Sequence, residues 1–501
     1  MSNAVISCLD ERVAAGDGAR PLIVTPLGTT TYAQLLERAC GVGHALRALG
    51  VEPEQRVAML LHDGVEWAAT FFGALRIGAV AVPLNTRLPA DRLVGLLRDS
   101  RAKVLIAEAD LAAPLDAAGE RLPHLRTRLT REALHARLIG MPTALDPEPM
   151  SDDDMAFWLY TSGTTGTPKG AVHAHGDLRA GHHYGADVLA VGPDDRIFAT
   201  SKLFFAYALG NGLLIPTLAG ARTFLHPGWA TPESVAGVMA EFHPTVLFSV
   251  PTFYAHLVRS ALPAQTFASL RCAVSAGERL PEEIYHAFRA RFGVEILDGV
   301  GATETIFMFL ANRPGQSRAG SAGTPVPGTD VRLLGPDGEE VAVDTPGVLH
   351  VRTPSASGRY WNRGEASRRA FLGEWFRTGD VYTRDGDGFY YHRGREDDLF
   401  KVAGMWVSPT DIERVLLSHP GVADAGVVGA EDAGGLVKPF AFVVATREGG
   451  PAARLVDDLR ALAASRLATH EQPRAIVLVD ELPRTATGKL QRFALRARRP
   501  A

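Results

Sequence analysis

Residues 157–170 read Phe-Trp-Leu-Tyr-Thr-Ser-Gly-Thr-Thr-Gly-Thr-Pro-Lys-Gly and form the most informative stretch of the chain. The stretch begins as an apolar, aromatic run, which is typical of a buried strand. Six residues with a hydroxyl group or no side chain follow, and these are Thr161, Ser162, Gly163, Thr164, Thr165 and Gly166. Glycines let a backbone approach an anion, hydroxyls donate hydrogen bonds, and Lys169 adds a mobile positive charge. The pattern favours a polyphosphate-binding loop.

A plain Gly/Ser/Thr connection between two elements would have a similar sequence. A Walker A loop is excluded, because Pro168 separates the glycines from Lys169 and breaks the required Gly-Lys-Ser/Thr order. The phosphate interpretation therefore depends on the other motifs along the chain.

The composition is that of a globular enzyme with more than one domain. A length of 501 residues exceeds what one hydrophobic core normally supports. The net charge of -4 gives no reason to expect nucleic acid or a membrane as partner. The three cysteines, Cys8, Cys40 and Cys272, are far apart and suit a reducing compartment, and the N-terminus lacks a signal-peptide pattern. We expect a cytoplasmic protein.

Lysine is rare in this chain. Only six of the 52 basic residues are lysines, at positions 103, 169, 202, 401, 438 and 489. Where arginine is so strongly preferred, a lysine can mark a site that needs a compact ammonium group.

The hydrophobic pattern predicts an α/β fold. Amphipathic helical patterns alternate with short apolar runs, which predicts a parallel sheet covered by helices. The predicted helices are 32–49, 67–77 and 90–99, and the predicted strands are 57–61, 79–84, 103–107, 245–250 and 271–275. The pattern is strand-rich after about residue 320, polar over 394–409, and typical of a compact α+β module from Asp411. We predict a large domain over 1–394, a hinge at 395–398 and a small domain over 399–501.

Four further motifs follow the glycine-rich stretch in order. Residues 298–304, Asp-Gly-Val-Gly-Ala-Thr-Glu, come after the apolar run 294–297 and put a hydroxyl and a carboxylate at a strand end. Glu304 is suited to Mg²⁺, which prefers oxygen ligands together with phosphates. The other three motifs are Trp375-Phe-Arg-Thr-Gly-Asp380, Gly394-Arg-Glu-Asp-Asp398 and Leu482-Pro-Arg-Thr-Ala-Thr-Gly-Lys489. Alone, each would pass for an exposed turn.

Taken in order, these motifs resemble those of the adenylate-forming superfamily, which includes acyl- and aryl-CoA synthetases, luciferases and peptide-synthetase adenylation domains. The resemblance implies a large domain of helix-covered sheets with a small β-rich subdomain, and a small α+β domain that moves. It also implies that the polyphosphate loop and Lys169 bind ATP. The remaining nucleotide contacts that it implies are Gly277, Glu278, Asp298, Gly299, Thr303, Asp380, Arg395 and Lys489.

The same resemblance implies the chemistry. A carboxylic acid reacts with ATP to give an acyl-AMP and pyrophosphate, with Lys489, Thr303, Glu304 and Lys169 as catalytic residues and Glu304 as the metal ligand. The small domain then rotates about Asp397, and a thiol displaces AMP. Gly404 and Trp406 would line the tunnel for coenzyme A.

Residues 202–212, 275–278 and 298–304 are most similar to those of benzoate-CoA ligases. The resemblance implies a flat apolar slot with Tyr207 as polar handle, formed by Phe205, Ala206, Tyr207, Ala276, Gly301, Ile306 and Phe307. Ala206 stands where amino-acid-activating relatives carry an aspartate, so an α-amino acid is disfavoured, because a buried cation would lack its partner. Phe307 stands where we expect histidine, which leaves the ring substituent open.

The predicted function is therefore an ATP- and Mg²⁺-dependent aryl-CoA ligase acting on a small aromatic acid, as a monomer or homodimer. Alternatives are an aryl-adenylating enzyme that loads a carrier-protein thiol, and a short- or medium-chain acyl-CoA synthetase. A kinase or ATPase would give ADP instead of AMP. A non-catalytic sensor on the same fold would have no need of Lys489.

Overall fold

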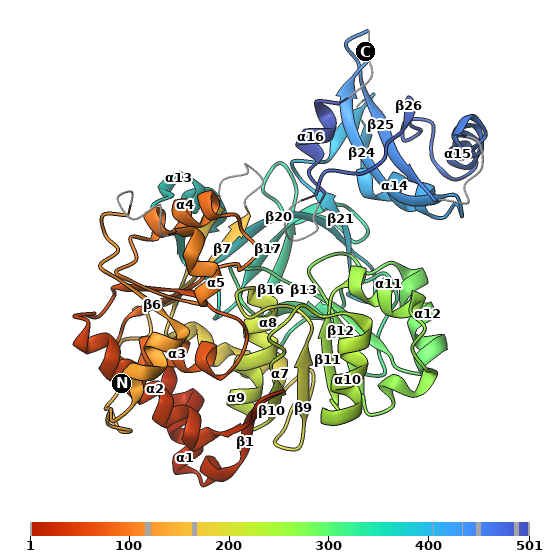
Figure 1. The fold of residues 1–501 in the computed structure, drawn as a ribbon. Helices are drawn as coiled ribbons and strands as arrows, with labels where there is room; N and C mark the ends of the chain where they lie inside the picture. Colours follow the sequence, from red (N-terminus) through yellow and green to blue (C-terminus); the bar gives the residue numbers. More distant parts are fainter. Residues whose placement is uncertain are drawn as a thin grey trace. The chain divides into compact units, whose positions relative to one another are not determined.

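A computed structural model describes residues 3–115, 122–162, 168–403, 405–432, 434–446, 452–484 and 490–498. The chain forms two compact units (Figure 1). The larger unit comprises Met1–Val331 with Val351–Arg377, and the smaller comprises Arg332–His350 with Thr378–Ala501. The predicted hinge at 395–398 and the domain limits built on it stay predictions.

The first sheet of the larger unit contains the glycine-rich stretch. Among the described residues its strand order is β18-β8-β7-β4-β3-β5-β6. The strands are β3 (Arg56–Leu60), β4 (Val80–Pro83), β5 (Val104–Ala107), β6 (Thr127–Thr130), β7 (Met155–Ser162), β8 (Pro168–Ala174) and β18 (Arg359–Tyr360). Strands β3 to β6 are parallel, which confirms the prediction from the alternating pattern. Strands β7 and β8 pair antiparallel, so the predicted phosphate loop connects the two strands of a hairpin.

The second sheet of the larger unit has the order β15-β14-β13-β12-β11-β9-β10-β1-β2 in the described part of the chain. Its strands are β1 (Pro21–Thr25), β2 (Gly28–Thr31), β9 (Arg196–Ala199), β10 (Arg222–Phe224), β11 (Val246–Ser249), β12 (Cys272–Ser275), β13 (Ile296–Gly301), β14 (Met308–Ala311) and β15 (Thr324–Pro325). Figure 1 shows helices α10 (Pro232–Phe242), α11 (Pro251–Arg259) and α12 (Glu282–Phe292) beside β11 and β12. The carboxyl ends of β11, β12 and β13 lead into the predicted site segments.

The main hydrophobic core uses one face of each of these sheets. In β3, Val57 and Met59 belong to this core, whereas Ala58 and Leu60 belong to a second cluster on the opposite face. In β11, Phe248 packs in the main core and Leu247 in a third cluster. Successive side chains of a strand point to opposite faces, so the continuous apolar runs of these strands reflect burial on both faces.

Helices of the larger unit agree closely with the sequence pattern. Helix α2 (Tyr32–Ala48) begins at a capping box of Thr31 and Gln34, α3 spans Val65–Arg76, and α4 spans Ala90–Ser100. Further helices are α1 (Glu11–Ala14), α5 (Ala109–Ala112), α6 (Arg131–Leu138), α7 (Gly181–Gly185), α8 (Ala206–Ala208), α9 (Ile215–Ala219) and α13 (Gly364–Ala370), and a π-helix, η5, spans Leu209–Leu214.

Two predicted boundaries were wrong. The strand expected to end at residue 297 continues as β13 to Gly301, because residues 299–301 pair antiparallel with β14. The polar stretch 394–409 contains a hairpin of β22 (Phe400–Val402) and β23 (Met405–Val407). In both places the backbone pairs as strands, although glycine content and polarity are signals for turns and loops.

The smaller unit has its own core. Strands β24 (Val422–Glu431), β25 (Val437–Ala445) and β26 (Ala475–Leu478) form a sheet, and Val427, Ala441 and Ile476 pack with residues of α14 (Pro409–Leu417) and α15 (Ala452–Arg466). Strand β21 (Tyr390–Arg395) and α16 (Arg492–Arg496) also belong to this unit, β19 (Phe371–Leu372) belongs to the larger unit, and each of three strands contains residues of both units: β16 (Asp330–Leu334), β17 (Gly347–Arg352) and β20 (Trp375–Arg384).

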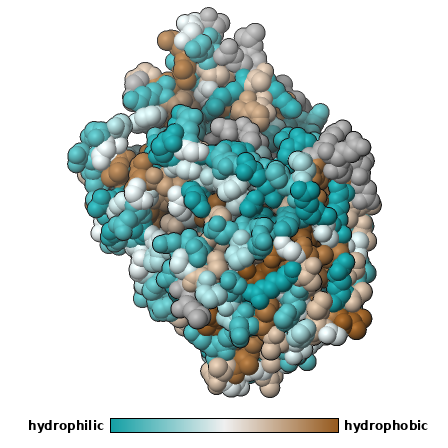
Figure 2. Space-filling view, turned by 90° about the vertical axis from the view of Figure 1, so that its left-hand side faces the viewer, coloured by the Kyte–Doolittle hydropathy of each residue, from teal (hydrophilic) through white to brown (hydrophobic). Residues whose placement is uncertain are grey.

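Hydrophilic residues dominate the face drawn in Figure 2, with apolar residues interspersed in small groups. No helix among the described residues combines the length and apolar character needed to cross a membrane. The apolar stretch 203–221 is largely buried in the main core, as expected for a segment inside a globular domain.

Gly73→Ala should destabilise the larger unit. A Cβ at residue 73 of α3 would lie 2.7 Å from the Cβ of Val42 and 2.8 Å from the carbonyl oxygen of Ala39, both on α2. Overpacking of this kind costs about 1–3 kcal/mol. The matched control is Gly95→Ala in α4, where a Cβ meets no atom within 4 Å; it should be neutral or stabilising by up to about 1 kcal/mol. Thermal unfolding of both variants tests this, and equal shifts would contradict it.

Candidate active site

Lys169 and Glu304, which are 135 positions apart in the sequence numbering, meet at one tyrosine. Tyr360 of β18 donates a hydrogen bond from its hydroxyl to Oε1 of Glu304 over 2.6 Å. The Nζ of Lys169 lies 5.2 Å from the centre of the same tyrosine ring. Glu304 and Tyr360 are each only 8% exposed. A cation and a carboxylate are therefore held near each other at the end of the β7–β8 hairpin.

The segment 303–307 after β13 is a tight turn held by its backbone. The carbonyl of Thr303 accepts a hydrogen bond from Nε2 of His173 (2.8 Å), and the carbonyl of Glu304 accepts one from the amide of Ser357 (2.7 Å). The carbonyl of Thr305 accepts one from the Ser355 hydroxyl (2.7 Å). These contacts come from β8 and from the loop before β18, so separate parts of the larger unit fix the turn.

Ile306 within this turn has a φ of 54°. A β-branched residue rarely adopts positive φ, and such a conformation costs about 1–3 kcal/mol. The amide of Phe307 hydrogen-bonds back to the carbonyl of Thr305 over 2.5 Å, which closes the turn at Ile306. The bend at Ile306 gives Glu304 and Phe307 different surroundings, although both belong to one short segment.

Most of the residues predicted for the aryl slot belong to the main core or pack against it. Ala206, Ala276, Ile306 and Phe307 are buried members of the main core, and Tyr207 packs against that core. Phe307 has room because its neighbours are glycines: a Cβ on Gly181 would lie 2.6 Å from its ring, and one on Gly210 would lie 3.2 Å away. A Cβ on Gly301 would lie 2.8 Å from the carbonyl oxygen of Phe307. Phe205, at the start of α8, is half-buried. The structure thus places Gly301 beside Phe307 and buries Ala206, Ala276 and Ile306 in the same core, and their role stays a prediction.

Tyr207 is anchored through its hydroxyl. The hydroxyl lies 3.0 Å from the carbonyl oxygens of both Ser249 and Val274, to which it donates its hydrogen. Burial raises the pKa of Tyr207 well above its ordinary value, so the phenol stays neutral. As a polar handle, which remains a prediction, it would act as a hydrogen-bond acceptor for a ligand.

Two of the predicted nucleotide contacts, Gly277 and Glu278, follow β12. Gly277 adopts a φ of 90°, a conformation that L-residues with a side chain rarely adopt, and Glu278 accepts a hydrogen bond from the Thr252 hydroxyl over 2.8 Å. Asp298 pairs in register with Ser275 across β12 and β13. Burial raises the pKa of Asp298 to about 7, against the lowering effect of nearby hydrogen-bond donors. Gly299 lies in β13, where a Cβ would meet the Leu310 carbonyl at 2.8 Å.

The predicted ribose contacts lie in the smaller unit, where the sheet register places them opposite each other. Asp380 of β20 pairs with Arg395 of β21, and the guanidinium lies 3.0 Å from the carboxylate. Burial raises the pKa of Asp380, but His392 and Arg395 lower it more, so the net shift is downward. A carboxylate held ionised suits a site that accepts two hydroxyl hydrogen bonds.

The segment after Arg395 has one anchored and one exposed carboxylate. The Asp398 carboxylate forms ion pairs with Arg492 and Arg496 of α16, each at 3.3 Å. The Asp397 side chain is exposed, and its carbonyl accepts a hydrogen bond from Arg496 over 3.1 Å. Asp397 as the hinge stays a prediction.

The other predicted residues belong to the glycine-rich stretch, to residues 404–406 and to the C-terminal motif. Gly163, Thr164, Thr165, Gly166, Gly404 and Lys489 lie outside the described residues, as does the side chain of Ser162. Thr161 belongs to β7, opposite Lys169 in the hairpin register. Trp406 is 50% exposed on the β22–β23 hairpin, with the Nζ of Lys401 4.7 Å from its ring centre.

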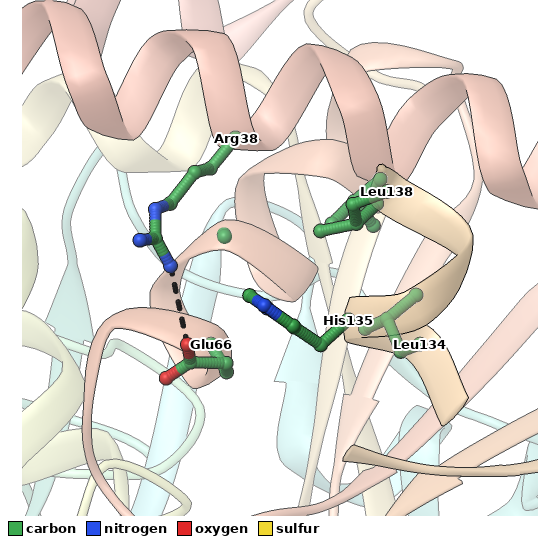
Figure 3. Close-up of a pocket in the computed structure, with 7 residues that line it drawn as sticks. Arg38, Glu66, Leu134, His135 and Leu138 are labelled. Carbon is green, nitrogen blue, oxygen red and sulfur yellow. Dashed lines mark hydrogen bonds and ion pairs between the residues drawn. The ribbon is translucent and has the colours of Figure 1, made fainter. Parts of the chain in front are cut away.

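A small hollow between α2, α3 and α6 contains none of the predicted site residues. Arg38 and Glu66 form an ion pair of 3.2 Å at its edge, and Leu134, His135 and Leu138 project from α6 (Figure 3). Its mainly aliphatic lining and single ion pair give it no chemistry of its own.

Comparison with known sequences decides the family. The family model of AMP-binding enzymes matches residues 10–361, and that of the AMP-binding enzyme C-terminal domain matches residues 411–489. The chain belongs to the AMP-binding enzyme family. The resemblance inferred from the motifs is thereby confirmed, and so is the expected α/β architecture with a C-terminal α+β module.

Relatives within the AMP-binding enzymes match over the whole chain. The 4-hydroxybenzoate–CoA/benzoate–CoA ligase of Rhodopseudomonas palustris is 41% identical, over 99% of this chain and 94% of that protein. The structure of an anthranilate CoA ligase in complex with anthranoyl-AMP superposes with a TM-score of 0.93 at 36% identity, covering 99% and 97% of the two chains. A benzoate CoA ligase from Burkholderia xenovorans LB400 gives 0.90 at 40% identity, covering 99% and 100%.

Sequence reasoning missed three residues that organise this AMP-binding enzyme's site. Tyr360 joins Lys169 to Glu304, while His173 holds Thr303 and has Asp177 3.0 Å from its Nδ1. His173 stands four residues after Lys169, and its place opposite Phe157 is seen only in the β7–β8 register. Tyr360 lies far from every motif, so nothing in the sequence pattern pointed to it.

Asp298→Asn should stabilise the protein more as the pH rises. A carboxyl group whose folded pKa is raised contributes stability that is complete below its unfolded pKa near 4 and is lost as the pH rises through about 7. The variant lacks this loss, so its advantage over wild type should grow by on the order of 2 kcal/mol between pH 5 and pH 8.

The control for this prediction is Asp195→Asn in the same unit. The pKa of Asp195 is lowered by Arg271, Thr245 and the Gly192 amide despite burial, so its contribution is complete above about pH 4 and should not change from pH 5 to pH 8. Calorimetric unfolding at both pH values distinguishes the variants. A difference for Asp298→Asn that is independent of pH would contradict the raised pKa.

Proposed function

We propose that this chain is an ATP-dependent aryl-CoA ligase that joins benzoate or a substituted benzoate to coenzyme A and releases AMP and pyrophosphate. The observation that carries the proposal is the 303–307 turn. Glu304 shares Tyr360 with Lys169 on its polar side, and Phe307 is buried in the main core, to which Ala206 and Ala276 also belong. One short segment thus faces both a nucleotide and an aromatic acid. The relatives named above are CoA ligases of aromatic acids, and one of their structures contains anthranoyl-AMP.

The first step joins the acid to the nucleotide. A carboxylate oxygen attacks the α-phosphorus of ATP, the bond from that phosphorus to the bridging oxygen breaks, and pyrophosphate leaves, giving aryl-AMP. Lys169 and Lys489 offset the repulsion between the carboxylate and the triphosphate and stabilise the negative charge that develops. Asp380 and Arg395 hold the ribose, and the small domain brings Lys489 to the reacting atoms.

The second step transfers the acyl group. The sulfur of coenzyme A attacks the acyl carbonyl, the mixed anhydride breaks and AMP leaves with both electrons of the broken bond, while the thiol proton passes to solvent. We infer that the small domain turns about Asp397 between the steps, with the adjacent Asp398 held by Arg492 and Arg496. Trp406 and Lys401 on the β22–β23 hairpin then approach the thiol. Two different sets of residues thus act at the same pocket, one set in each step.

Glu304 is suited to hold Mg²⁺. It is a nearly buried carboxylate whose Oε1 is oriented by the Tyr360 hydroxyl, and Mg²⁺ is commonly held by one or two carboxylates together with substrate phosphates. When bound, the ion would neutralise phosphate charge. The chain's own part is to hold the Glu304 carboxylate in place through the Tyr360 hydroxyl.

The slot favours a planar, uncharged ring. Ala206, Ala276 and Phe307 are buried and apolar, and Tyr207 gives its hydrogen to backbone carbonyls. A substrate ammonium group would find no carboxylate at Ala206, and its burial would be costly. Phe307 in place of histidine favours benzoate itself over ring-hydroxylated acids that would need a polar partner at that point.

The test is a pyrophosphate-release screen over benzoate, its hydroxy, amino and chloro derivatives, cinnamates and short fatty acids, each with and without coenzyme A. We expect benzoates to give pyrophosphate and AMP in equal amounts, and aryl-CoA when coenzyme A is present. Aryl-AMP that coenzyme A fails to capture would indicate a carrier-protein acceptor. Preference for fatty acids, or release of ADP, would contradict the proposal.

A further inference from the structure

A buried ion pair lies at the start of the segment that forms the aryl slot. Lys202 is 4% exposed and Asp63 is 7% exposed, and Nζ lies 3.6 Å from Oδ2. Asp63 follows β3 of the first sheet, whereas Lys202 follows β9 of the second. The pair therefore links the two sheets of the larger unit next to Phe205, Ala206 and Tyr207.

Each partner also binds backbone on its neighbour's side. The Asp63 carboxylate accepts hydrogen bonds from the amide of Leu203, at 3.2 and 3.3 Å from its two oxygens. The Lys202 ammonium donates to the carbonyls of His226 (2.5 Å) and Pro227 (3.2 Å). The turn at 202–205, closed by a hydrogen bond from the Phe205 amide to the Lys202 carbonyl, is thus gripped from both sides.

Aromatic side chains complete the anchor. Phe204 lies 4.5 Å from Phe205 and 6.2 Å from Trp229 between ring centres, and Arg87 lies 3.5 Å above Trp229. A compact ammonium with three donors can serve two carbonyls and one carboxylate in this space, which the planar guanidinium of arginine could not match. This accounts for a lysine in a chain that otherwise prefers arginine.

We propose that Asp63 and Lys202 are positioning residues for the aryl substrate, which set the 202–205 turn and through it the wall of the slot formed by Phe205, Ala206 and Tyr207. This inference rests on the proposed function for its substrate. It assigns the pair no contact with ATP, whose predicted contacts lie in β7, β8 and β13, in the segments that follow β7, β12 and β13, and in the smaller unit.

The test compares Lys202→Met with Lys103→Met in benzoate-dependent ATP–pyrophosphate exchange. Lys103 is a matched control, because it also donates to a backbone carbonyl, that of Gly50, far from the slot in the fold. Lys202→Met should raise the KM for benzoate about tenfold or more and leave the KM for ATP within about twofold. Lys103→Met should change neither, and Lys202→Arg should not restore the benzoate KM.

Two further variants separate positioning from general damage. Asp63→Asn should have a smaller effect, because its amide oxygen still accepts the Leu203 hydrogen bond. Adding it to Lys202→Met should recover part of the lost benzoate affinity, because no unpaired buried charge then remains. Equal increases in the KM for ATP and benzoate, or a benzoate KM unchanged by Lys202→Met, would overturn the inference.

Hydrogen exchange provides a readout without substrate. Peptides covering 200–214 should exchange faster in Lys202→Met and at the wild-type rate in Lys103→Met; unchanged exchange in both would overturn the anchoring. If the wild type acted on no aromatic acid, the proposed function would fail, while this measurement would still decide whether the pair anchors the turn.

Discussion

The hydrogen bond between Tyr360 and Glu304 and the strained turn that follows it are the constraint on which the site depends. In the proposed function Glu304 faces phosphate and Phe307 faces an aromatic ring, although two residues separate them. A relaxed backbone would carry the chain on as a strand or helix. The positive φ of Ile306 bends it at once, and hydrogen bonds to the backbone of 303–305 from His173, Ser355 and Ser357 hold the bend.

The two sheets give this turn its rigidity. Because both faces of β3 and β11 are buried, each sheet is fixed by its cores, and the connections at the strand ends inherit that fixed position. The Asp63–Lys202 pair adds a link between the sheets on the aryl side, while the β7–β8 hairpin brings Lys169 and His173 to the nucleotide side. Local strain and buried charge, which are costly in isolation, are tolerated because the surrounding fold over-determines them.

Periodicity and motif order carried much of the fold and some of the site. Helices α2, α3 and α4 and strands β3, β4 and β5 lie within a few residues of their predicted positions, because burial on one or both faces leaves a direct mark on the sequence. Asp380 and Arg395 were each expected to contact the ribose only through the family resemblance; the register of β20 and β21 places them opposite each other, and their role stays a prediction.

What the sequence could not provide is contact between distant, ordinary residues. Tyr360 has no motif, Asp63 stands in an unremarkable turn, and the continuation of β13 to Gly301 depends on pairing with β14 instead of on local propensity. The conformation of Ile306 is likewise imposed by its surroundings, since a β-branched residue predicts the opposite backbone. Sites are built where local preference is overruled, so local preference predicts them least well.

The most direct measurement is benzoate-dependent ATP–pyrophosphate exchange without coenzyme A, in wild type and in Glu304→Gln. The account predicts exchange in the wild type, a loss on the order of 100-fold in the variant, and unchanged binding of benzoate, because the aryl wall is separate from the carboxylate. Exchange at the wild-type rate in Glu304→Gln, or loss of benzoate binding along with it, would show that the turn does not divide the two substrates as described.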